Sequence, residues 1–250
     1  MFPLVNITIP SYVFFSTLGA ISAIILLFFR MERFDITFRQ LLLYMLFSGI
    51  TLLIGSRLLF FLTMIPEIIR DFSADKMLYY MFNGGIVFYG GLLGMLFGIW
   101  LCAKIKHDDK GKLFNFVAPA IPLFHFWERI GCFFGGCCYG VENSWGFSMA
   151  ASPEVIRFPV QLFESFFNLL IFISLMIMSE KFKSDKLLMI YLMEYSCCRF
   201  VLEFFRGDSV RGTWGILSTS QIISLIILLF CIIHISNPSK GRKTQYERLL

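Results

Sequence analysis

The sequence predicts an all-α, polytopic integral membrane protein with seven transmembrane helices, its N-terminus outside and its C-terminus in the cytoplasm. Of its 250 residues, 57% are hydrophobic and 16% are charged, whereas a soluble domain is usually about 45–50% apolar and about 25% charged. The mean hydropathy is +0.74. The apolar residues form seven long runs, and the basic residues favour alternate connections between these runs.

Seven stretches have the length that a transmembrane helix needs, which is roughly 20 mainly apolar residues. The first run lacks the basic segment before it and the small-residue site after it that mark a cleavable signal peptide, so we expect it to be retained. We predict one membrane domain over residues 1–236, with an extracytoplasmic loop at about 135–158 and a basic cytoplasmic tail at 237–250. The predicted spans are Ser11–Phe29, Gln40–Met64, Phe82–Ala103, Leu113–Phe133, Pro159–Ser179, Leu187–Phe205 and Gly215–Ser236.

The distribution of Lys and Arg predicts the orientation, because cytoplasmic loops carry an excess of these residues. One set of alternate connections, together with the C-terminal tail, holds 14 of the 22 basic residues, and the other set holds five. The basic residues therefore follow the topology and do not cluster on one face, so nucleic acid is not an expected partner. The five on the predicted outer side are Arg70, Lys76, Arg157, Arg206 and Arg211.

The three remaining basic residues, Arg57, Arg129 and Arg199, fall within spans. Counting about 1.5 Å per residue from the cytoplasmic end of each span puts them about 27, 25 and 20 Å deep. The hydrocarbon core is about 30 Å thick, so all three are predicted in its outer half. Most other polar groups of the spans share this level: Tyr89, His125, Glu128, Gln161, Glu164, Glu203 and Gln221.

Polar groups gathered from six spans at one level predict a hydrated, cation-lined pocket open to the outer leaflet. A charged group near a helix centre costs about 2.5–3.5 kcal/mol on insertion scales, so such groups usually have a function. Arginine binds phosphate through two parallel hydrogen bonds, which makes an anionic phospholipid headgroup the expected ligand. The alternative is that Arg129–Glu128 and Arg199–Glu203 are structural contacts that hold the bundle together.

Two segments carry the most specific polar patterns. In HFWERIGCFFGGCCYG, residues 125–140, His125 and Arg129 are four residues apart and share a helix face. In YSCCRFVLEFFRGD, residues 195–208, Tyr195, Arg199 and Glu203 form one polar stripe at the same spacing. The first segment also holds three cysteines that could be metal ligands, a redox pair or small packing residues, of which packing is favoured: Cys132, Cys137 and Cys138.

These segments, with GSRL at 55–58, FYGGLLG at 88–94 and FPVQLFE at 158–164, resemble bacterial prolipoprotein diacylglyceryl transferases. The resemblance implies a bacterial plasma-membrane enzyme that transfers the diacylglyceryl group of phosphatidylglycerol to the lipobox cysteine of a preprolipoprotein. It also implies that Arg129 and Arg199 are the essential arginines and that Gly140, Tyr195 and Glu203 are functional positions. We expect membrane lipids as further partners and no metal or cofactor, because the phospholipid carries its own leaving group.

Three positions depart from the family pattern: Tyr89 stands where the family usually has His, Cys132 where it has Asn, and Cys137 where it has Glu. The missing His is a proposed general base. We predict that His125 takes its place, with Tyr89 as the second choice. Residues expected to contact substrate in addition to those that the resemblance implies are Arg57, Gln161, Glu164 and Arg206.

Three other functions remain open from the sequence. The loss of the family His would fit a phosphatidylglycerol-dependent transferase with a different acceptor. A transporter or lipid-binding protein could use the same cationic pocket, although no internal repeat of the kind found in many transporters is present. A thiol oxidoreductase could use Cys137 and Cys138.

Overall fold

The structure is a computed structural model that describes residues 10–70, 73, 75, 77–78, 87–150, 152–179, 186–208, 213–214 and 216–236. Three parts of the sequence-based prediction lie outside these residues: the tail at 237–250, the start of the third span at 82–86, and Gly215. So do eight basic residues used to predict the orientation, which are the four of the tail and Lys76, Lys181, Lys183 and Arg211.

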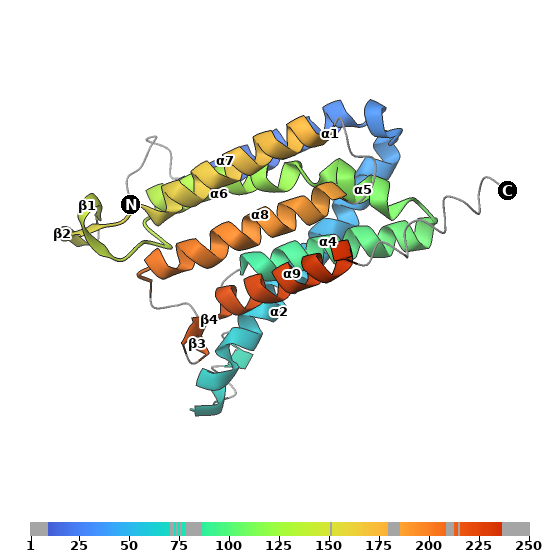
Figure 1. The fold of residues 1–250 in the computed structure, drawn as a ribbon. Coiled ribbons are helices and arrows are strands. Elements are labelled where there is room, and N and C mark those ends of the chain that lie inside the picture. The colour runs from blue at the N-terminus through green and yellow to red at the C-terminus, as the bar shows by residue number, and fades with distance from the viewer. Residues whose placement is uncertain are drawn as a thin grey trace.

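Helices dominate the described residues, and each of the seven predicted stretches contains one (Figure 1). The helical prediction is therefore confirmed. The helices are α1 (Ser11–Arg30), η1 (Glu32–Phe34), α2 (Phe38–Arg70), α4 (Phe88–Lys106), α5 (Lys110–Val117), α6 (Ala120–Gly135), α7 (Val160–Ser179), α8 (Lys186–Leu202), η2 (Glu203–Phe205) and α9 (Thr219–Ser236).

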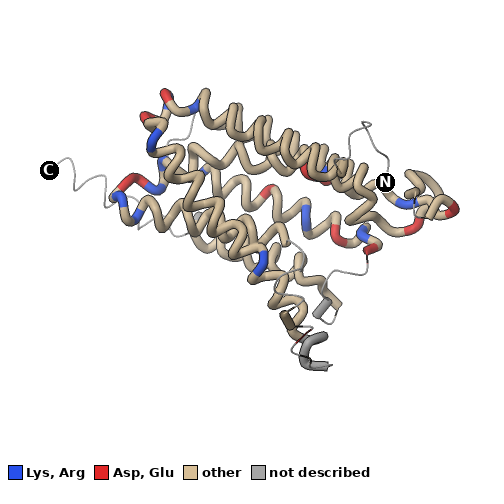
Figure 2. Tube along the Cα trace, turned by 180° about the vertical axis from the view of Figure 1, so that it is seen from behind, with Lys and Arg blue, Asp and Glu red and all other residues tan. Residues whose placement is uncertain are grey.

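Four helices among the described residues are long and apolar enough to cross a membrane: Ser11–Arg30, Phe38–Ile65, Phe88–Lys106 and Val160–Ser179. Thr219–His234 is apolar but shorter. Figure 2 shows Lys and Arg gathered at one end of the bundle and sparse along its length. The prediction of a membrane protein with several apolar helices is thus confirmed. The number of seven spans and the orientation stay predictions.

The predicted fourth span, Leu113–Phe133, is two helices and not one continuous helix. α5 ends at Val117, and α6 begins at Ala120 after Pro119. Proline has no N–H to donate and its ring clashes with the preceding turn, so the helix breaks here. The seventh helix also starts later than predicted, because residues 213–214 (β3) and 217–218 (β4) pair as short antiparallel strands before it.

The predicted extracytoplasmic loop at 135–158 contains an antiparallel hairpin of β1 (Glu142–Met149) and β2 (Ser152–Arg157). The pairing shifts register twice, between Glu142 and Phe147 and between Ser148 and Met149. The hairpin projects beyond one end of the helices (Figure 1). The sequence analysis predicts a loop here but not its strands, although Trp145, Phe147 and Met149 occupy alternate positions of β1.

The helices pack in a defined order. α1 packs on α6, α6 on α7, α7 on α8, and α8 on α9, while α2 packs on α4. A core of buried apolar residues joins α4 to α8 and α9 through Tyr89, Leu92, Tyr191, Tyr195 and Cys231. α6, α7 and α8 are therefore neighbours, so polar side chains on their facing sides can meet.

The contact between α2 and α4 depends on glycine, because their backbones approach closely. A Cβ added at Gly94 of α4 would collide with the carbonyl oxygen of Thr51 in α2, whereas one added at Gly49 would meet nothing within 4 Å. Small residues allow helices in membranes to approach in this way.

We therefore expect Gly94→Ala to destabilise the protein in detergent by about 1–3 kcal/mol, the usual cost of overpacking. For a chain of this length that lowers the midpoint of thermal unfolding by several degrees. Gly49→Ala is the matched control and should leave the midpoint unchanged or raise it, because alanine favours helix. Equal midpoints for Gly94→Ala and the unsubstituted protein would contradict the close approach of α2 and α4.

Candidate functional site

The carboxylate of Glu164 in α7 is the centre of a buried polar network. Its Oε1 accepts a hydrogen bond from the hydroxyl of Tyr195 at 3.2 Å. Its Oε2 accepts one from Nη1 of Arg199 in α8 at 3.2 Å, and Nη1 of Arg129 in α6 lies 3.6 Å from the same oxygen. Two guanidinium groups from different helices therefore converge on a single oxygen atom.

Each of the two arginines is also paired with a second glutamate. Arg129 donates from Nε and Nη2 to the two carboxylate oxygens of Glu128, at 3.0 and 3.1 Å. Nη2 of Arg199 lies 2.7 Å from a carboxylate oxygen of Glu203, which is one helical turn further along the chain. All of these side chains are buried, with at most 8% of any residue exposed.

To the predicted cation-lined recess this pairing adds a carboxylate partner for each arginine. The network contains carboxylates beside both arginines, so its charges are largely compensated. The reason is physical: an unpaired charge buried in a protein or a membrane is costly, and a hydrogen-bonded partner of opposite sign offsets that cost.

His125 lies between the two carboxylates that face Arg129. Its Nε2 is 3.4 Å from Oε2 of Glu128 and 3.7 Å from Oε1 of Glu164. The imidazole is fully buried and stacks on Phe88 of α4, with ring centroids 3.9 Å apart. The shared helix face predicted for His125 and Arg129 therefore leads to the same network.

The structure separates Tyr89 and Arg57 from this centre in different ways. The hydroxyl of Tyr89 lies 2.6 Å from Oγ of Ser224, so it links α4 to α9. The centroid of its ring lies 5.8 Å from that of Tyr195, so Tyr89 is beside the network. Arg57 is on the exposed side of α2, unlike the buried Arg129 and Arg199. Depth along a helix, which the sequence gives, does not determine the direction in which a side chain points.

Gly140, Gln161 and Arg206 hold the segment that follows α6. Gly140 pairs with Arg206 across an antiparallel bridge, and a Cβ at Gly140 would collide with the carbonyl oxygen of Phe158. Nε2 of Gln161 donates to the carbonyl oxygen of Cys137 at 2.8 Å. The guanidinium of Arg206 makes two contacts with the carboxylate of Asp208. These three predicted site residues thus brace the backbone beside the network.

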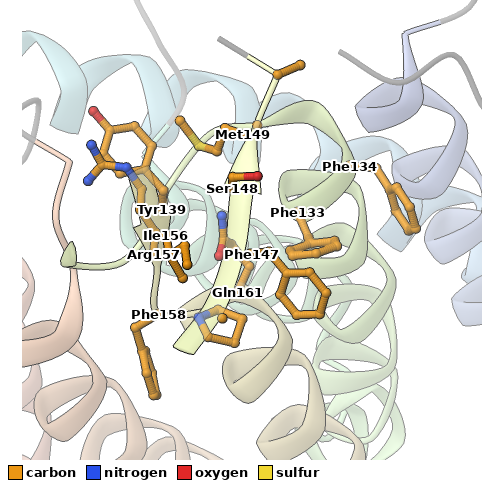
Figure 3. A pocket seen from close by; sticks show the side chains of 14 residues that line it. Phe133, Phe134, Tyr139, Phe147, Ser148, Met149, Ile156, Arg157, Phe158 and Gln161 are labelled. Atoms are coloured by element: carbon orange, nitrogen blue, oxygen red, sulfur yellow. The ribbon is translucent and has the colours of Figure 1, made fainter. Parts of the chain in front are cut away.

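A pocket of about 520 Å³ lies between the end of α6, the β1–β2 hairpin and the start of α7 (Figure 3). Five of its fourteen lining residues are aromatic, Phe133, Phe147 and Phe158 among them, and Arg157 and Gln161 contribute a guanidinium and an amide. Gln161 and Glu164 are three residues apart in α7, so they lie on adjoining turns of the same side. The pocket is therefore next to the charged network, although neither arginine of the network lines it.

Several members of the network are not among the site residues predicted from the sequence. Glu128 holds Arg129 in two hydrogen bonds, and the hydroxyl of Tyr12 in α1 donates to Glu128 at 3.1 Å. Oγ of Ser220 accepts from Arg199 at 3.3 Å. The position of Glu128 next to Arg129 in the sequence could have identified Glu128 as a site residue. Nothing in the sequence around Tyr12 or Ser220 indicates their contacts.

The model of the prolipoprotein diacylglyceryl transferase family matches residues 1–236 of the chain. The chain belongs to this family. It is 32% identical over 251 residues to phosphatidylglycerol–prolipoprotein diacylglyceryl transferase 2 of Clostridium perfringens (strain 13 / Type A), which covers 97% of this chain and 96% of that protein. It is 31% identical over 250 residues to phosphatidylglycerol–prolipoprotein diacylglyceryl transferase of Clostridium tetani (strain Massachusetts / E88), over 97% of this chain and 98% of that protein.

The family is also matched outside the clostridia. Phosphatidylglycerol–prolipoprotein diacylglyceryl transferase of Idiomarina loihiensis is 32% identical over 182 residues, which cover 70% of this chain and 68% of that protein. The resemblance recognised from the motifs is therefore confirmed. The buried arginine and glutamate network described above is the structure that those motifs build in this prolipoprotein diacylglyceryl transferase family member.

Proposed function

We propose that this protein transfers the diacylglyceryl group of phosphatidylglycerol to the lipobox cysteine of a preprolipoprotein and releases glycerol phosphate. Relatives that match nearly the whole chain are named for phosphatidylglycerol and prolipoprotein. The observation that carries the proposal is the convergence of Arg129 and Arg199 on one oxygen of Glu164. Two guanidinium groups that reach one carboxylate oxygen can also reach one phosphodiester.

The proposal includes seven membrane spans, with the site facing the extracytoplasmic leaflet of a bacterial plasma membrane. The alternation of basic residues supports this orientation. Helices occupy all seven predicted stretches, which supports the number of spans. Phosphatidylglycerol would then enter from the outer leaflet, and the secreted acceptor would reach the site from the same side.

Arg129 and Arg199 would bind the headgroup phosphate through their N–H groups, some of which now face the carboxylate of Glu164. Each guanidinium has five N–H donors, so the contacts with Glu128 and Glu203 can be kept while the phosphate is bound. Tyr195, through its hydrogen bond to Glu164, fixes the carboxylate between the two arginines. Gly140, Gln161 and Arg206 would hold the loop at the mouth of the site, and Arg57 would contact the headgroup from the exposed side of α2.

In the proposed reaction a base removes the proton of the acceptor thiol. The sulfur then attacks the carbon of the diacylglyceryl group that is bonded to a phosphate oxygen. A carbon–sulfur bond forms as the carbon–oxygen bond breaks, and its electron pair stays on the phosphate of the departing glycerol phosphate. Arg129 and Arg199 stabilise the charge that develops on this phosphate. His125 is the proposed base, and Glu128 and Glu164 would compensate the charge of its imidazolium.

The test is to incubate the detergent-solubilised full chain with phosphatidylglycerol and a lipobox peptide and to analyse both products by mass spectrometry. We expect a diacylglyceryl mass increase on the peptide cysteine and an equal amount of glycerol phosphate. The same peptide with serine in place of cysteine is the control and should stay unmodified. Binding of phosphatidylglycerol without transfer would favour a lipid-binding protein, and transfer to a different acceptor alone would replace the preprolipoprotein.

His125→Ala should lower turnover about 10²–10⁴-fold, the usual contribution of a general base. His234→Ala, on the exposed side of α9, is the matched control and should retain full activity. Turnover is measured with saturating phosphatidylglycerol, and thermal unfolding checks that the variant is folded. Full activity of a folded His125→Ala variant would remove His125 as the base, and Tyr89→Phe would then test the second choice.

A further inference from the structure

Three cysteine thiols meet beside the charged network. The Sγ atoms of Cys132, Cys137 and Cys138 all lie within 4.8 Å of one another. Cys132 is buried in the last turn of α6, Cys138 is half-buried, and Cys137 is exposed. All three are free thiols, and the proposed transfer reaction uses none of them.

The turn after α6 brings these thiols together. Gly136 has a φ of +69°, which ends the helix, and the N–H of Cys137 bonds back to the carbonyl oxygen of Cys132 at 3.1 Å. Cys138 also has a positive φ, 55°, a conformation that residues other than glycine rarely adopt. Gln161 holds the carbonyl oxygen of Cys137 at 2.8 Å. The thiols are therefore positioned by the backbone and by a neighbouring helix, not by chance contact of flexible side chains.

We propose that Cys132, Cys137 and Cys138 form a binding site for one soft metal ion, Zn²⁺ or Cu(I). Thiolates select these ions, and a bond of about 2.3 Å from sulfur to zinc puts the ligand sulfurs about 4 Å apart. The present spacing therefore needs only small movements. Because Cys137 is exposed, an ion can enter and can keep one coordination position for water or another ligand.

The charges around the cluster support bound thiolates. Arg129 and Arg206 both lie close enough to interact electrostatically with Cys138. Three thiolates and one ion of charge +1 or +2 carry net negative charge, which both guanidinium groups attract although each also pairs with a carboxylate.

The experiment uses the detergent-solubilised full chain, purified without a polyhistidine tag and reduced in the absence of oxygen. Excess Zn²⁺ is added to one sample and Cu(I) to another, unbound ions are removed, and bound metal is counted by elemental mass spectrometry. We expect one ion per chain in at least one sample. Co²⁺ added in place of Zn²⁺ should give the charge-transfer absorption of sulfur ligands.

Cys132→Ser and Cys137→Ser should each weaken binding at least about tenfold. Cys137 is exposed, so its variant keeps the test valid if Cys132→Ser does not fold. Cys197→Ser, at an exposed cysteine of α8, is the matched control and should bind as the unsubstituted protein does. Absence of stoichiometric metal in both samples, binding that survives both cluster substitutions, or a disulfide within the cluster that persists under reduction would each overturn the proposal.

Discussion

Replacing Arg199 by lysine is expected to lower the turnover of phosphatidylglycerol by about two orders of magnitude, the usual cost of removing one donor that stabilises charge in a transition state. Lysine keeps the positive charge but has a single ammonium group in place of the planar fork. In the structure this fork reaches Glu164 through Nη1 and Glu203 through Nη2. Lysine cannot keep both contacts and bind a phosphate as well.

The measurement is the rate of glycerol phosphate release with the lipobox peptide, together with the midpoint of thermal unfolding. Arg39→Lys, at an exposed arginine near the start of α2, is the matched control and should keep full turnover. Arg129→Ala and Arg199→Ala should abolish transfer while the protein is still inserted in the membrane. Normal turnover in any folded variant at position 129 or 199 would contradict the proposed role of the arginine pair.

The part of the site that could be predicted from the sequence is the part that follows from helix geometry. A spacing of four residues puts His125 and Arg129, and likewise Tyr195, Arg199 and Glu203, on common faces. In the structure those faces meet at the same buried network. The positions of the helices were also predictable, because runs of apolar residues and their polar boundaries are local properties of the chain.

What could not be predicted depends on contacts between distant segments. The depth of Arg57 resembles that of Arg129, yet its side chain is exposed, because rotation about the helix axis is set by packing partners. The shared contact of both arginines with Glu164 is visible only once α6, α7 and α8 are neighbours. The break at Pro119 was available from the sequence, since proline interrupts a helix, but the apolar run around it resembles a continuous span.

The largest combined effect on activity and stability is expected for Glu164→Gln. Glutamine has nearly the shape of glutamate and can still accept from Tyr195, but it removes the negative charge between Arg129 and Arg199. Removing one partner of a buried ion pair typically costs about 3–5 kcal/mol, and the lower end applies here because each arginine keeps a second glutamate partner. We therefore expect a clear drop in the midpoint of thermal unfolding and, since the arginines lose their common support, a fall in turnover of about a hundredfold.

Glu194→Gln is the matched control, because Glu194 is a half-buried glutamate of α8 that accepts a hydrogen bond from Ser174, outside the network. It should change neither turnover nor the unfolding midpoint appreciably. Glu164→Asp keeps the charge but shortens the side chain, so it should restore stability more than turnover if Glu164 positions the arginines for the phosphate. A Glu164→Gln variant with unchanged turnover and midpoint would show that the two guanidinium groups are held in place without this carboxylate. That result would contradict the role of Glu164 in positioning Arg129 and Arg199 for the phosphate.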